Sequence, residues 1–104
     1  MIDIQKEIKE LTFQIIEKYK PEKIILFGSA ARGEFTPDSD LDFLIVKKDT
    51  PYYGIDRMRE IDNLITTKVA ADFLVYRPDE IENRIKMGDP FIKVIFKEGK
   101  VLYG

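Results

Sequence analysis

The chain has 104 residues, which suits one domain with a modest hydrophobic core and is too short for a catalytic domain plus a separate substrate domain. Charged residues make up 35% of the chain but the formal net charge is only −2, so the composition lacks the basic surface expected for direct nucleic-acid binding. Cysteine and histidine are both absent, which excludes disulfides, thiolate nucleophiles and the usual zinc sites. We predict a single domain over residues 1–104 whose chemistry rests on carboxylates, hydroxyls, Lys and Arg.

The N-terminal segment does not have the pattern of a signal peptide or a membrane anchor. The first ten residues alternate charged and apolar side chains, and no apolar run approaches the ~20 residues that span a bilayer. We therefore expect a cytoplasmic protein without a membrane segment.

The first third of the chain predicts a helix followed by a strand. A helix is expected over residues 2–19, with Asp3 as its N-cap, because apolar residues recur there at helical spacing, namely Ile4, Ile8, Leu11 and Ile15. Residues 23–27 form a short apolar run closed by Gly28, which favours a buried strand over a second helix.

The rest of the chain alternates strand-like and helix-like segments. The predicted elements are, in order, a strand over residues 41–47, a helix over 54–68, a strand over 69–76, helices beginning near Pro78 and Phe91, and a closing strand over 100–103. This order indicates an α/β (α+β) fold built on a small mixed sheet.

Two aspartates at the start of the second strand are the most unusual feature of the sequence. Asp40 and Asp42 lie two residues apart, so their side chains leave the same face of the strand with Cα atoms roughly 6–7 Å apart. Two adjacent carboxylates repel each other unless a cation holds both. All-oxygen ligands favour Mg²⁺, with Mn²⁺ as the alternative, and Asp72 completes the cluster if the second and third strands are neighbours in register.

A candidate phosphate-binding turn follows the first strand. Gly28 allows close approach of the backbone, and Ser29 offers a hydroxyl and can cap a helical turn over residues 29–32. Arg32 and Ser39 are further candidates for donating hydrogen bonds to a phosphate. Carboxylates that hold two metal ions beside a phosphate cradle suit in-line displacement at a phosphorus atom.

Gly28-Ser29, ten intervening residues, Asp40-Leu41-Asp42 and the later Asp72 together resemble the signature of the nucleotidyltransferase superfamily that includes DNA polymerase β and the antibiotic nucleotidyltransferases. The short chain resembles the minimal nucleotidyltransferases, which often act as the antitoxin beside a HEPN-family ribonuclease toxin. The resemblance covers essentially the whole chain and implies the nucleotidyltransferase fold.

The resemblance also implies roles for individual residues. Gly28 and Ser29 would hold the phosphates of ATP, the substrate, and Asp40 and Asp42 would ligate two Mg²⁺ ions. Asp72 would ligate the catalytic metal and help to deprotonate the acceptor hydroxyl. In such family members AMP is transferred from ATP to a tyrosine of the partner toxin. The alternatives are nucleotidyl transfer to a small molecule such as an aminoglycoside, and an antitoxin that acts by binding alone.

Several features concern partners and packing. The acidic face must stay open to substrates, so helices are expected mainly on the other face, and the apolar residues beyond the acids need cover from the C-terminal segment or from another protein. We therefore expect a homo-oligomer or a complex. Tyr52 and Tyr53 are predicted to be exposed anchors for a partner. Arg57 and Arg59 are expected to be solvated.

Overall fold

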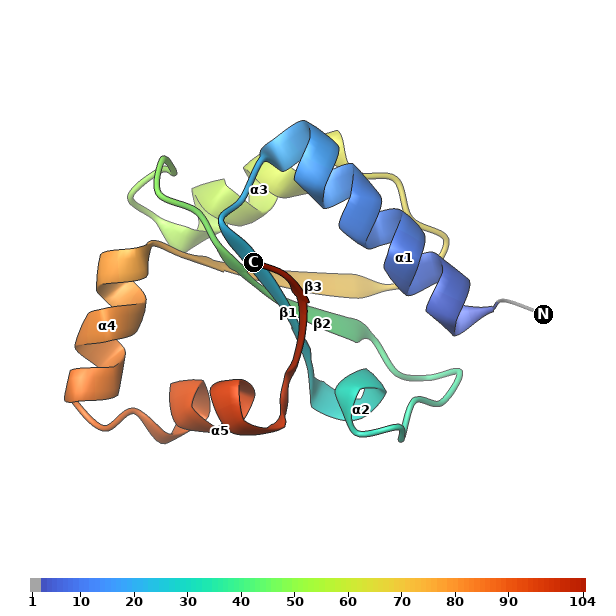
Figure 1. Cartoon of the computed structure of the whole chain (residues 1–104). Coiled ribbons are helices and arrows are strands. Elements are labelled where there is room, and N and C mark those ends of the chain that lie inside the picture. The colour runs from blue at the N-terminus through green and yellow to red at the C-terminus, as the bar shows by residue number, and fades with distance from the viewer. Residues whose placement is uncertain (1–2) are drawn as a thin grey trace.

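The computed structural model describes residues 3–104, which form a four-stranded sheet with helices on both faces (Figure 1). The strand order is β3-β2-β1-β4, with β1 antiparallel to both β2 and β4, and β2 parallel to β3. The bounds are Lys23–Phe27 for β1, Leu41–Val46 for β2, Ala71–Tyr76 for β3 and Lys100–Tyr103 for β4. The predicted α/β fold with a mixed sheet is therefore confirmed.

The helices form one layer on each face of the sheet (Figure 1), so the prediction that they pack mainly on one face is wrong. One layer holds α1 (Ile4–Gln14), the π-helical turn η1 (Ile15–Tyr19) and α3 (Gly54–Leu64), and the other holds α4 (Pro78–Lys86) and α5 (Pro90–Glu98), while the short α2 (Gly28–Ala31) follows β1. α4 and α5 cover the apolar part of the acidic face. Because β2 and β3 are parallel, a crossover must join them, and α3 provides it. Within residues 3–104, none of the helices is both long and apolar enough to cross a membrane.

The N-terminal helix differs from its prediction at its C-terminal end. Asp3 caps α1 as predicted, accepting the backbone N–H groups of Gln5 at 3.2 Å and Lys6 at 3.3 Å, while the predicted start at residue 2 lies outside the described residues. The final turn is π-helical, and the N–H of Lys20, which has a φ of 56°, donates to the carbonyl of Ile15 at 3.1 Å. Hydrophobic spacing alone does not distinguish this wider turn from an α-helical one.

The segment between α3 and β3 is longer than predicted. The predicted helix over residues 54–68 ends at Leu64, and the predicted strand over residues 69–76 begins only at Ala71. The intervening loop is tied to α1, because the Gln14 side chain accepts the Thr66 N–H at 2.9 Å and donates to the Thr66 carbonyl at 2.7 Å. This long-range contact, which has no counterpart in the local sequence pattern, satisfies the backbone outside either element.

Two apolar clusters hold the layers to the sheet. The larger lies under α1, η1 and α3, and the smaller lies between α4, α5 and the opposite face of the sheet. Leu44 and Val46 of β2 belong to the smaller cluster, so the C-terminal helices supply the cover predicted for the apolar end of the acidic face. Gly99 allows this close packing, because a Cβ there would lie 3.2 Å from the carbonyl oxygen of Leu26.

Arg57, expected to be solvated, is instead a buried hub with only 3% of its surface exposed. Its guanidinium donates to the carbonyl oxygens of Pro51 at 2.5 Å, Tyr52 at 3.0 Å and Val75 at 3.0 Å. It also forms a bidentate pair with Glu80, at 2.6 and 3.2 Å. Burial of Arg57 is tolerated because each nitrogen of the guanidinium donates to an acceptor. The local sequence around α3 does not indicate these acceptors.

This ion pair predicts a measurable pH dependence of stability. The Arg57 guanidinium lowers the pKa of Glu80, so the carboxylate stabilises the fold above the ordinary Glu pKa, and that contribution is lost as the pH falls through the lowered value. We expect Glu80→Gln to be less stable than wild type near neutral pH and to approach it in strong acid. Urea unfolding of both proteins from about pH 7 to about pH 3 measures this; a constant difference at every pH would contradict it.

Candidate active site

The register of the sheet places two of the predicted ligands side by side. Asp42 in β2 pairs directly with Asp72 in the parallel strand β3, and on its other side it pairs with Phe27, the last residue of β1. These three residues form a row across one face of the sheet, where neighbouring strands are about 4.8 Å apart. The sequence expectation that Asp72 joins the acidic cluster depended on this register.

Asp42 is the electrostatic centre of the row. Burial raises the pKa of the Asp42 carboxyl, and the nearby charges of Asp72 and then Asp40 raise it further, while Arg32 opposes the shift. Asp40 directly precedes β2 and is exposed, as is Asp72. The three carboxylates are therefore close enough to repel one another, and a bound cation would remove that repulsion.

The donor set fits a hard divalent cation. Only carboxylate oxygens are available, which suits Mg²⁺ or Mn²⁺ and not the nitrogen and sulfur ligands that zinc prefers. Within residues 3–104, no three acidic side chains already stand in positions to share one metal ion. Binding would therefore require Asp40, Asp42 and Asp72 to reorient, and in that state the metal would neutralise charge on a phosphate during displacement.

Gly28 is the residue that brings the phosphate turn against the acidic row. It has a φ of 73°, and a Cβ at this position would overlap the carboxylate of Asp42 and lie 3.3 Å from its Cγ. Gly28 also begins α2, whose N-cap is Phe27, so Ser29 lies inside the helical turn and is not its cap as predicted. The backbone of α2 and the Asp42 carboxylate can thus approach one ligand together.

Gly28→Ala is expected to lower activity by at least about 100-fold and to destabilise the fold by about 1–2 kcal/mol, because an L-residue is strained at this φ and its Cβ would displace Asp42. Gly33→Ala is the matched control. Gly33 has a φ of 74° but no atom within 4 Å of the added Cβ, so it carries the same backbone strain without the overlap. Equal activity losses in the two variants, measured with labelled ATP, would contradict the role of the Asp42 contact.

The side chains of the two remaining candidates, Arg32 and Ser39, already form hydrogen bonds within the chain. Arg32 is the C-cap of α2, and its Nε donates to the Glu34 carboxylate at 2.8 Å, an interaction that raises the pKa of Arg32. The Ser39 hydroxyl accepts the Thr36 N–H at 3.1 Å and lies 3.0 Å from the Thr36 hydroxyl. A phosphate would have to compete for both groups, so their roles stay predictions.

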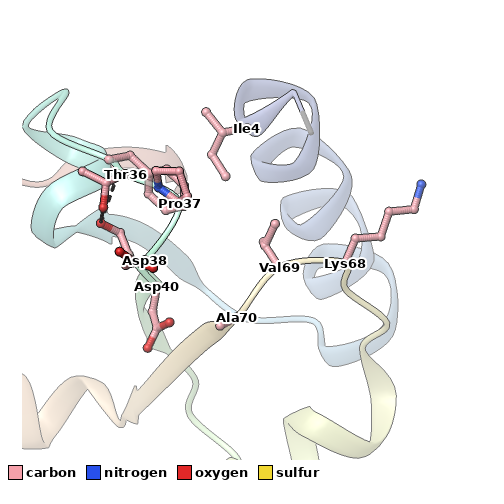
Figure 2. A pocket seen from close by; sticks show the side chains of 10 residues that line it. Ile4, Thr36, Pro37, Asp38, Asp40, Lys68, Val69 and Ala70 are labelled. Carbon is pink, nitrogen blue, oxygen red and sulfur yellow. Dashed lines mark hydrogen bonds between the residues drawn. The ribbon is translucent and has the colours of Figure 1, made fainter. Parts of the chain in front are cut away.

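A cavity of about 570 Å³ lies beside Asp40, next to the segments that lead into β2 and β3. Figure 2 shows Ile4 of α1 facing Thr36 and Pro37, with Val69 below Ile4 and the Asp40 carboxylate pointing away from Ile4. The cavity falls in the volume range of small-molecule sites. The sequence pattern did not indicate this cavity.

Sequence reasoning also treated Phe27 and Phe91 only as parts of a strand and a helix. Their rings form an edge-to-face pair, with centroids 5.9 Å apart and an interplanar angle of 88°. The position of Phe27 directly before Gly28 was the one local signal that an aromatic residue borders the site.

Comparisons with known proteins agree with this arrangement. The chain matches the Nucleotidyltransferase domain family over residues 8–103. It is 38% identical over 101 residues to a protein of Methanocaldococcus jannaschii that is provisionally named a protein adenylyltransferase, with 95% of this chain and 97% of that protein covered. A second protein of that organism, with the same provisional name, is 28% identical over 108 residues and covers 95% of this chain and 74% of its own length.

A crystal structure from Sulfolobus solfataricus, provisionally described as a nucleotidyltransferase, has the same fold. Its TM-score is 0.56 at 27% identity, with 77% of this chain and 78% of that chain covered. The family match spans nearly all of the described residues, including β1, α2, β2 and β3, which carry the candidate site. This protein therefore belongs to the nucleotidyltransferase domain family.

Proposed function

We propose that the protein is a Mg²⁺-dependent adenylyltransferase that transfers AMP from ATP to a tyrosine hydroxyl of a HEPN-type ribonuclease toxin and thereby acts as its antitoxin. The observation that carries the transfer chemistry is the direct pairing of Asp42 with Asp72 beside the Gly28 turn. The protein acceptor is supported by the names of the relatives, and the toxin by the resemblance to minimal nucleotidyltransferases.

The reaction replaces one bond to the α-phosphorus with another. The acceptor oxygen attacks the α-phosphorus, its proton passes to a base, and the bond to the bridging oxygen breaks to release pyrophosphate. In this proposal Gly28 and Ser29 hold the phosphates, Asp40, Asp42 and Asp72 hold the metal ions, and Asp72 also takes the acceptor proton. Asp72 suits that role because it is exposed on an edge strand, where a large acceptor has access.

The test uses labelled ATP, Mg²⁺ and a purified HEPN-type ribonuclease toxin. We expect a label and a mass gain of AMP on a tyrosine of that protein, together with loss of its RNase activity. The Asp42→Asn/Asp72→Asn variant serves as the control for catalysis. Neutralisation by this variant without any mass gain would overturn catalysis and favour an antitoxin that acts by binding alone.

An exposed aromatic pair offers a contact for such a partner. The side chains of Tyr52 and Tyr53 are 75% and 65% exposed and pack against each other with centroids 5.0 Å apart. Aromatic anchors commonly contribute 2 kcal/mol or more to an interface, so we expect Tyr52→Ala/Tyr53→Ala to weaken toxin binding by at least about 30-fold. Isothermal titration calorimetry measures this; unchanged affinity would remove the pair from the interface.

A second candidate function is nucleotidyl transfer to a small molecule, which the cavity beside Asp40 favours through its size. A thin-layer assay with labelled ATP and both acceptor classes separates the two. Transfer to an aminoglycoside, with none to the HEPN-type protein, would replace the leading proposal.

A further inference from the structure

An exposed phenylalanine borders the acidic row. Phe91, in the first turn of α5, is 46% exposed, although its ring packs edge-to-face on Phe27. Phe27 pairs with Asp42 across the sheet and immediately precedes Gly28. The Phe91 ring thus contacts Phe27, and Phe27 adjoins both the Gly28 turn and Asp42.

The backbone at Phe91 is held in place by a capped corner between α4 and α5. Asp89 caps α5 by accepting the Phe91 N–H at 2.9 Å, and the Arg84 guanidinium donates to the other Asp89 oxygen at 3.0 Å. Pro90, at the first helical position, fixes its own backbone. A ring held in this way is preorganised for binding, so little conformational freedom is lost when a ligand stacks on it.

The proposed reaction suggests a direction for the nucleoside. If the phosphates bind at the Gly28 turn, an acceptor would attack from the side opposite the leaving pyrophosphate, toward Asp72 at the sheet edge. Farther along the same face, Leu44 is fully buried beneath the C-terminal helices. The nucleoside would then face α5, where Phe91 presents an exposed aromatic ring.

We propose that Phe91, supported by Phe27, is the stacking surface for the nucleobase of the bound nucleotide. This inference rests on the proposed function, because it assumes a nucleoside triphosphate at the Gly28 turn. An edge-to-face pair leaves ring surface free for a third ring. Because every base has a π-face, stacking adds affinity for the nucleoside without selecting one base.

The chain contains no tryptophan, which permits a direct optical test. Phe91→Trp places a single indole at the proposed stacking position. Mg·ATP is expected to quench its fluorescence, whereas Mg·tripolyphosphate, which has phosphates but no base, is expected to leave it unchanged. Phe13→Trp is the matched control, because Phe13 is 65% exposed on α1, over the opposite face of the sheet, and should respond to neither ligand (Figure 1).

A second variant measures the effect on affinity while keeping the apolar contact with Phe27. Phe91→Leu removes the aromatic ring and is expected to weaken Mg·ATP binding by about tenfold, the size of a typical base–aromatic stack, with little change in Mg·tripolyphosphate binding. Isothermal titration calorimetry gives both dissociation constants, and circular dichroism checks the fold.

The outcomes separate this inference from the proposed function. ATP binding to Phe91→Trp by calorimetry without quenching, or equal loss of ATP and tripolyphosphate affinity in Phe91→Leu, would overturn the stacking role and leave the adenylyltransferase intact. Failure of the wild-type protein to bind Mg·ATP at all would overturn the proposed function, and the stacking role with it.

Discussion

Asp42→Asn is expected to lower the rate of AMP transfer by about a thousandfold or more and, at the same time, to stabilise the metal-free protein. In the proposed function the rate falls because the carboxylate at the centre of the acidic row would no longer hold the metal ions, whose charge stabilisation is worth several kcal/mol in such reactions. A labelled-ATP assay at saturating Mg²⁺ measures the loss.

Asp42→Asn is expected to raise stability, although it lowers activity, because the folded state disfavours the ionised Asp42 carboxylate. The pKa of Asp42 is raised, so the folded protein binds the proton more tightly than the unfolded chain does. Above the raised pKa the ionised group opposes folding, and this opposition disappears as the pH falls through that value. Asn is neutral at every pH, so thermal unfolding at neutral pH without divalent ions should occur at a higher temperature than for wild type.

Asp62→Asn is the control for both measurements, because Asp62 is exposed on α3 and should change neither. A wild-type rate in Asp42→Asn would contradict the metal site. A lower melting temperature without metal would contradict the electrostatic account of Asp42.

Arg57→Met is expected to cost about 3 kcal/mol of unfolding free energy, the largest effect on stability that we predict. The substitution removes a buried ion pair and strips three backbone carbonyls of their donor. For a domain of this size, this corresponds to a decrease in melting temperature of roughly 12–20 °C. Denaturant unfolding near neutral pH measures the free energy.

Arg59→Met provides the matched comparison two residues along the same helix. Arg59 is exposed, so its replacement should change stability by less than about 0.5 kcal/mol. Arg57 joins the Tyr52 loop, α3, β3 and α4. If the two variants were equally stable, these contacts of Arg57 would not be important for the fold.

The strands and the acidic row were predictable because their signals are local. β1 is an apolar run ended by Gly28, and the spacing of Asp40 and Asp42 fixes a shared face whatever the strand pairs with. The residue types also predict Mg²⁺ or Mn²⁺ as the metal, and this stays a prediction. The pairing of Asp42 with Asp72, however, required a parallel register that only the assembled sheet defines.

The features that were missed depend on contacts between segments distant in sequence. Arg57 looks like an ordinary surface arginine until α4 brings Glu80 to it, 23 residues later. The loop after α3 is held by hydrogen bonds between Gln14 and Thr66, which are 52 residues apart. Similarly, Phe91 becomes part of the site only because α5 packs across the face that carries Phe27. No local pattern contains these contacts.

The position of β1 between β2 and β4 also sets an order of assembly during folding. Leu26 pairs with Phe43 of β2, 17 residues away, whereas Ile24 pairs with Tyr103 of β4, 79 residues away. Closing the longer loop costs about 1.4 kcal/mol more in chain entropy. We expect the β1–β2 pair, with the phosphate turn and Asp42, to form before α5 and β4 dock. The site would then acquire its phosphate and metal half first and its aromatic wall last.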